Sequence, residues 1–221
     1  MFASKNLFLS EIIPTVTYVT LVDNATAQTT YTFTDASIGA PGLIVVAYHT
    51  EVQGSTPRTF VSATIGGSAA TSVVTRAQTG VNSTTTGLIS RRITSGSTAT
   101  VSITMSGACL RARIAIWSIN NNVSDTAFTT ASAGAASGTG LSLTLNSVPA
   151  NAVGMVAQTN GVENTAITWT NATERYDSQI GAGATQASGA DFFTTASGNR
   201  TITTTHISSS QALSAAAAVW R

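Results

Sequence analysis

The chain has 221 residues, of which 43% are hydrophobic and only 9% are charged, and its formal net charge is +1. About a quarter of the residues of ordinary soluble domains are charged, so this surface must be coated by hydroxyl groups more than by ions; serine and threonine together number 65. Lys5 is the only lysine, which excludes a basic stripe and argues against a nucleic-acid partner.

The first fourteen residues stand outside the pattern that follows them. They contain six large apolar side chains: Phe2, Leu7, Phe8, Leu9, Ile12 and Ile13. The i,i+4 pair Phe8/Ile12 indicates one or two turns of helix, or an extended tail, that ends at Pro14. An exposed terminus of this kind is an aggregation hazard unless it is covered. Residues 1–14 are therefore predicted to be an arm that docks onto a neighbouring subunit; the alternative is that the arm folds back on its own body.

No targeting or membrane-spanning segment is expected. Ser10 and Glu11 interrupt the N-terminal apolar run, and no small-residue cleavage site follows, so the start does not resemble a signal peptide. No segment approaches the roughly 18–20 apolar residues that cross a bilayer. The single cysteine, Cys109, excludes an intrachain disulfide and is expected to be a small buried core residue.

From Thr15 onward, alternating apolar residues and Gly- or Ser-containing turns predict strands. The first series comprises residues 16–22, 29–35, 42–51, 59–65, 69–77, 86–93, 99–105 and 110–119. Asn120–Asn122 and the Gly/Ser/Ala stretch 132–140 are interpreted as the seam between two halves. The second series comprises residues 141–146, 152–159, 164–169, 172–178, 190–195, 199–205 and 211–220.

The two series have the same order of elements, with about 100–110 residues between equivalents. This internal similarity predicts an all-β, jelly-roll-like antiparallel β-sandwich built from two similar halves, about 15–122 and 123–221. Because no Pro-rich or charged linker separates the halves, we expect one large sandwich over 15–221 in preference to two small tandem ones.

Two stretches, Leu43–Ala47 and Ala212–Trp220, are apolar without alternation. Such strands are normally covered on both faces, so both are expected to be central. Trp117 and Trp220 close matching apolar strands and are expected to be buried at equivalent places in the two halves.

The chain offers little chemistry. His49, His206 and Cys109 have no ligand-like spacing, so no metal, cofactor or catalytic role is expected for them. His49 and Glu51 alternate onto one strand face, which is interpreted as solvated. The carboxylates of Glu174, Asp177 and Asp191 form only a loose cluster, and a glycosidase needs two that converge. The sequence therefore predicts a protein that is not an enzyme.

Exposed aromatic side chains offer one route to a ligand, because sugars stack on them. Trp169 and Tyr176 are the candidates for such a platform, and packing in the core is the competing interpretation for both.

The chain contains several distinctive strings: Val61–Thr71, Ile114–Trp117, Val148–Ala150, Trp169–Asp177 and the terminal Ala-Val-Trp-Arg221. Together they resemble β-sandwich accessory structural proteins of tailed bacteriophages and gene-transfer-agent-like particles, and the resemblance covers nearly all of residues 29–221. It implies a virion component made in the bacterial host cytoplasm: a capsid decoration (cement) or head-spike protein, or alternatively a tail protein that binds a receptor or glycan. It also implies a homo-oligomer whose partner is the major capsid protein or another virion subunit, with no nucleic acid, membrane or cofactor.

Overall fold

The protein folds as a stack of β-strands. The computed structural model describes residues 12–161, 166–181 and 185–221, and no helix occurs in these ranges, hence none that could span a membrane. The strands are β1 (Thr15–Asn24), β2 (Gln28–Ser37), β3 (Gly42–Gln53), β4 (Phe60–Ile65), β5 (Ser68–Ala69), β6 (Thr71–Gln78), β7 (Asn82–Ile93), β8 (Thr98–Cys109), β9 (Arg111–Asn120), β10 (Thr129–Gly138), β11 (Ser142–Val148), β12 (Ala152–Asn160), β13 (Thr168–Thr170), β14 (Thr173–Gln179), β15 (Gln186–Thr194), β16 (Gly198–Thr205) and β17 (Ser210–Trp220).

Each half of the chain builds a similar pair of antiparallel sheets. In the first half, sheet A has the order β1-β9-β3-β7-β6 and sheet B the order β2-β8-β4-β5. In the second half, sheet C has the order β10-β17-β12-β15-β14 and sheet D the order β11-β16-β13. Strand for strand, sheet C repeats sheet A. The all-β prediction and the prediction of two similar halves are therefore confirmed.

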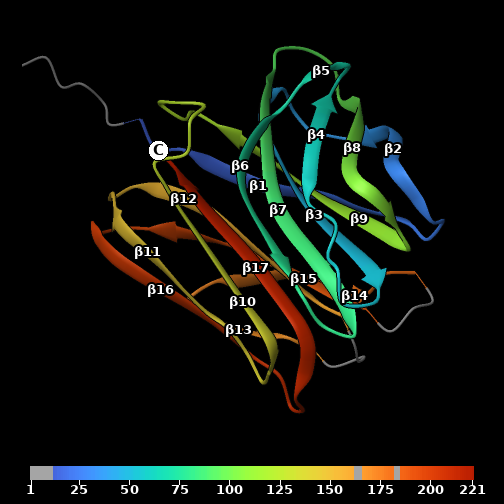
Figure 1. The fold of residues 1–221 in the computed structure, drawn as a ribbon. Coiled ribbons are helices and arrows are strands. Elements are labelled where there is room, and N and C mark those ends of the chain that lie inside the picture. The colour runs from blue at the N-terminus through green and yellow to red at the C-terminus, as the bar shows by residue number, and fades with distance from the viewer. Residues whose placement is uncertain (1–11, 162–165, 182–184) are drawn as a thin grey trace, which may run out of the picture.

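The four sheets stack in the order B, A, C, D (Figure 1). One apolar core lies between sheets B and A, another between C and D, and a third between A and C. The third core joins the two halves through residues such as Val45, Trp117, Met155 and Trp220. The expectation of one large sandwich is thus corrected: each half forms its own sandwich, and the two are held together by a shared core.

The halves meet through an approximately two-fold arrangement. Strand β6 of the first half contacts β10 of the second, and the equivalent pair, β14 and β1, meets through Tyr176 and Tyr18, whose rings stack at 5.9 Å. Likewise β7 contacts β17, while β9 meets β15 where the Trp117 indole donates to Asp191 at 3.0 Å. Sheets A and C are each covered on both faces, which explains the continuous apolar runs of β3 and β17. Each of these strands also has a neighbouring strand on both sides, so the predicted central positions are confirmed.

Both tryptophans predicted to anchor the core are fully buried, on the equivalent strands β9 and β17. Trp117 pairs with Val45 of β3, and Trp220 pairs with Val153 of β12. Each of these valines lies four residues after a proline, Pro41 or Pro149. The burial prediction is confirmed.

Strand β10 was not predicted, because its composition resembles that of a linker. Strand β10 occupies most of the Gly/Ser/Ala stretch that the sequence suggested was a seam, and it pairs with β17 along its length. Its small residues are required by the close approach of β6, since a Cβ on Gly134 would lie 2.4 Å from the Gln78 side chain and 2.5 Å from that of Arg76. Small residues at a tight strand contact look like a linker when only composition is considered.

Candidate functional site

His49 and Glu51 share a strand face, as predicted, but that face is not solvated. Both are buried, because sheet C covers this side of β3. Glu51 forms an ion pair with Arg111 at 2.8 Å, and nearby Arg113 pairs with Asp23 at 2.5 Å. The sequence could not reveal this burial, because an alternating strand does not show whether a second sheet lies over its polar end.

His49 lies at one end of a buried chain of hydrogen bonds between the two sandwiches. Its Nε2 is 2.7 Å from the Tyr176 hydroxyl and its Nδ1 is 2.8 Å from the Thr159 hydroxyl. Thr159 continues to Thr86 at 2.5 Å. The chain then passes through Ser214 and Thr84, at 2.8 Å per step, to the Ala212 carbonyl at 2.6 Å. All of these side chains are buried.

The carbonyl at the far end sets the direction of the bonds between Thr84 and His49. A carbonyl only accepts, so Thr84 donates to Ala212 and Ser214 donates to Thr84. Thr86 then donates to Ser214, whose hydroxyl and carbonyl oxygens lie 2.8 and 3.1 Å from it. Thr159 must then donate to Thr86 and accept from the Nδ1–H of His49. These bonds place a hydrogen on Nδ1 of His49. Burial keeps the ring neutral, so its Nε2 accepts from Tyr176, and every donor in the chain has an acceptor.

Burial, with a contribution from Arg113, lowers the pKa of His49 to about 3, which keeps the ring neutral. His206 is held in a second buried group: the Gln158 and Asn160 amides lie 2.8 and 3.3 Å from its Nε2. Burial lowers its pKa as well. Cys109 is buried as predicted, and burial raises the pKa of its thiol to about 11. In this arrangement all three residues serve packing and hydrogen bonding.

Two of the three loosely clustered carboxylates, Asp191 and Asp177, accept hydrogen bonds from residues of their own. Asp191 accepts from Trp117 and from Arg175, whose Nε lies 2.7 Å away. Asp177 accepts from the Ile167 amide and from Gln186. Burial, together with the charge of Asp177, raises the pKa of Glu174. Over the described ranges no three His, Cys, Asp or Glu side chains gather in a way that would hold a metal ion.

Neither aromatic candidate for sugar stacking is available at the surface. Trp169 lies on β13 with its indole donating to Ser188 at 2.7 Å, and Tyr176 lies on β14 against His49 and Trp117. Both are buried. Packing is the correct interpretation for both residues.

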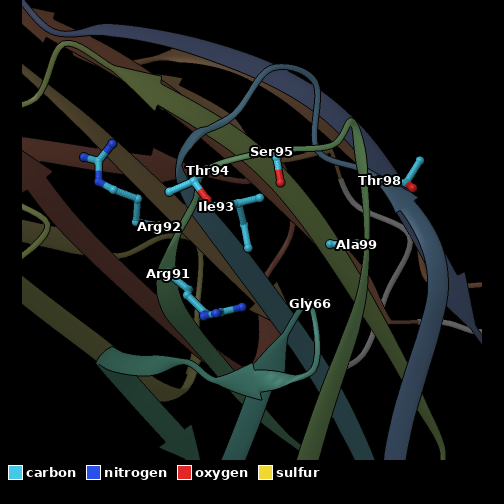
Figure 2. Close-up of a pocket in the computed structure, with 8 residues that line it drawn as sticks. All are labelled: Gly66, Arg91, Arg92, Ile93, Thr94, Ser95, Thr98 and Ala99. Carbon is cyan, nitrogen blue, oxygen red and sulfur yellow. The ribbon is translucent and has the colours of Figure 1, made fainter.

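A cavity of about 250 Å³ lies where the β4–β5 turn meets the β7–β8 hairpin (Figure 2). Two arginines line it, but both already have acceptors. Arg91 points across the cavity toward Gly66 and donates to the Ile65 carbonyl, whereas Arg92 points away and pairs with Asp125 at 2.5 Å. The cavity therefore does not present a free guanidinium group to an anion.

The outer faces of the stack are covered by hydroxyl groups, as the composition predicted. On sheet B, Thr30 and Thr104 lie 3.0 Å apart across neighbouring strands, and Thr32 faces Ser102. Sheet D shows the same pattern, with Thr144 and Thr201 hydroxyls 3.2 Å apart. These faces have few charges and few apolar side chains to hold a partner.

An apolar surface lies at one end of the molecule, where strands β1, β9 and β17 meet the segment between β9 and β10. Val123 and Phe128 are 68% and 58% exposed, and Ile12 and Ile13 are 57% and 47% exposed. These four residues are called the end surface. Val123 and Phe128 line a groove of about 370 Å³, the end groove, together with Ser124, Thr126, Ala127 and Arg221.

Backbone contacts bring the parts of the end surface together. Thr15 pairs with Asn120, so the start of β1 lies beside the segment that follows β9. The Val123 amide donates to the Arg221 carbonyl, and the Phe128 amide donates to the Val219 carbonyl. Figure 1 shows the start of the described chain next to the C-terminus. Ile12 and Ile13 were expected from the sequence to belong to a docking arm, whereas Val123 and Phe128 were not noticed. Phe128 could have been noticed, because it is a large aromatic residue inside a polar stretch.

No family model and no curated protein matches this sequence. The structure defines this protein as an all-β double sandwich.

Proposed function

We propose that this chain is a non-enzymatic structural protein of a bacteriophage-type particle, either a capsid decoration (cement) protein or a head-spike protein. The observation that carries the proposal is the end surface, an apolar region on a body whose outer faces are coated with hydroxyl groups. The sequence resemblance to accessory proteins of tailed phages supports the same conclusion.

An apolar surface of this kind is characteristic of a site that another macromolecule covers. Four of the eight large apolar side chains exposed on the described residues belong to the end surface. The arm predicted over residues 1–14 begins here; Phe2, Leu7, Phe8 and Leu9 lie outside the described residues, and Ile12 and Ile13 lie on the surface itself. An attachment site formed by the arm and the end groove suits a subunit that joins a large assembly.

The alternative function is a tail-associated module that binds a receptor or glycan. It would need exposed aromatic side chains with polar partners. Trp169 and Tyr176 are both buried, and the large aromatic side chains exposed on the described residues are Phe128 and Phe193. Because Phe128 lines the end groove, we favour the attachment role over receptor or glycan binding.

The test is whether the protein travels with a particle. Particles released by bacteria that express the chain are banded on a density gradient, and the protein is quantified against the major capsid protein by mass spectrometry. We expect a constant molar ratio across the particle band. Phe128→Ser should leave that band, whereas Val81→Ser should remain. Val81 is also apolar and 64% exposed, but it lies just before β7, away from the end groove. Wild-type protein found only at the top of the gradient would refute the proposal.

A further inference from the structure

The end groove is open, apolar and preformed. Val123, Ala127 and Phe128 supply its apolar lining, and its walls are fixed by backbone bonds to the last residues of β17. A groove of about 370 Å³ has room for a few large side chains. It therefore suits a short apolar peptide better than a flat protein surface.

The chain carries such a peptide at a suitable place. Eleven residues precede Ile12, and among them are Phe2, Leu7, Phe8 and Leu9. Fully extended, eleven residues reach about 36–40 Å, several times the roughly 10 Å that separates two packed sheets. The described chain begins at the edge of the end surface, and the side chains of Ile12 and Ile13 are exposed there.

We propose that the end groove binds the N-terminal arm, residues 2–9, of a second copy of this chain, so that copies are linked by exchanged arms. This inference rests on the attachment role proposed above and names the partner for the arm. Arm exchange between two copies gives a closed, symmetric dimer, and exchange around a ring gives a higher closed oligomer. In either form each groove is filled by the arm of a neighbouring copy, and the filled grooves recur at regular positions.

The geometry favours a neighbouring copy over the chain's own groove. The groove lies beside the point, near Pro14, where the arm joins the folded body. An arm that bound its own groove would therefore have to turn back close to this point. Pro14 at the root of the arm biases Ile13 toward extended backbone, which favours an arm that continues away from its own groove. An arm that reaches the groove of another copy needs no reversal.

Disulfide trapping separates the two arrangements. Two single variants, Leu9→Cys and Val123→Cys, are mixed and oxidised at micromolar concentration. Native Cys109 does not interfere, because it is buried and its thiol pKa is raised to about 11. We expect covalent heterodimers on a non-reducing gel, in clear excess over those formed when Leu9→Cys is mixed with the control Val81→Cys.

Two results would overturn the proposal. Heterodimers no more abundant than in the Val81→Cys control mean that the arm does not reach the groove of another copy. An intrachain disulfide in the Leu9→Cys/Val123→Cys double variant, without heterodimers from the mixed single variants, means that the arm covers its own groove.

A second measurement does not depend on cysteine placement. In sedimentation equilibrium, Phe128→Ser should weaken self-association by about tenfold or more, as expected for an aromatic anchor at an interface centre, and Val81→Ser should leave it unchanged. Equal association of both variants and the wild type would contradict the proposal. Trapped heterodimers of a protein that never bands with particles would refute the proposed function alone, whereas a particle-bound protein that forms no heterodimers would refute the arm exchange alone.

Discussion

Replacing His49 by glutamine should flatten the acid side of the stability profile. In the folded protein the ring is buried and its pKa falls from the ordinary 6.5 to about 3, chiefly through burial and secondarily through Arg113. The unfolded chain takes up a proton below pH 6.5, and the folded chain does so only near pH 3. The unfolding free energy is therefore unaffected by the titration of His49 above pH 6.5, and it decreases as the pH falls from 6.5 toward 3. Glutamine removes the titrating group but keeps a donor and an acceptor.

The magnitude follows from the two pKa values. A group that binds its proton only in the unfolded state costs about 1.4 kcal/mol of unfolding free energy for each pH unit below its unfolded pKa. Between pH 8 and pH 4.5, protonation of His49 in the unfolded chain should therefore lower the unfolding free energy of the wild type by roughly 3 kcal/mol. His49→Gln should lack this loss. At pH 8 the variant should be less stable by about 1–3 kcal/mol, because the Tyr176–His49–Thr159 bonds are imperfectly replaced.

Urea unfolding followed by tryptophan fluorescence at pH 8, 6.5, 5.5 and 4.5 measures this difference. Because the comparison is between two proteins that share all carboxylates, the raised pKa values of Glu174 and Asp177 cancel. His206→Gln is the matched control, since it removes the other buried histidine and should keep the His49 contribution. A gap between wild type and His49→Gln that stays constant from pH 8 to 4.5 would refute the buried, neutral assignment. So would a native-state His49 resonance that titrates near pH 6.5, and this readout remains if the variant fails to fold.

Three further predictions concern the core and the isolated side chains. Trp117→Ala and Trp220→Ala should each lower the unfolding free energy by about 3–5 kcal/mol in urea titrations; a loss below about 1 kcal/mol would mean that the ring is not part of the core. Gly189→Ala should displace the Tyr176 ring, which lies 2.5 Å from the added Cβ, and should destabilise by about 1–3 kcal/mol; unchanged stability and an unchanged acid slope would contradict the Tyr176–His49 contact. Metal analysis of unchelated protein should find well under one transition-metal ion per chain, and a stoichiometric ion would assign His49, His206 or Cys109 a role that we do not expect.

The similarity of the two halves could be predicted because it follows from sequence patterns that involve only near neighbours in the chain. Strand periodicity, turn residues and the apolar runs Leu43–Ala47 and Ala212–Trp220 depend on near neighbours in the chain, and they led to the all-β class, the two halves and the buried tryptophans. Strand β10 was missed because its composition reflects a contact with β6 rather than its own pairing.

The contact between sheets A and C could not be predicted in the same way. A strand sequence shows that a face is polar or apolar, but it does not show whether a hydrogen-bonded partner lies over the polar part. His49 looks like a solvated residue until the second sandwich supplies its partners Thr159 and Tyr176. The same limit hid the end groove, whose lining residues are brought to the start of β1 only by the pairing of Thr15 with Asn120.

The packing of the two sandwiches also limits where a partner can bind. Sheets A and C use both faces for internal cores, so they have no free face. The outer faces of sheets B and D present neutral hydroxyl groups, many of them paired with each other across strands, as between Thr30 and Thr104 and between Thr144 and Thr201. Apolar burial is the largest source of affinity in most protein association, and those faces offer little of it. Exposed apolar side chains lie around a groove at the end surface, which is why we propose the attachment role there and not on a sheet face.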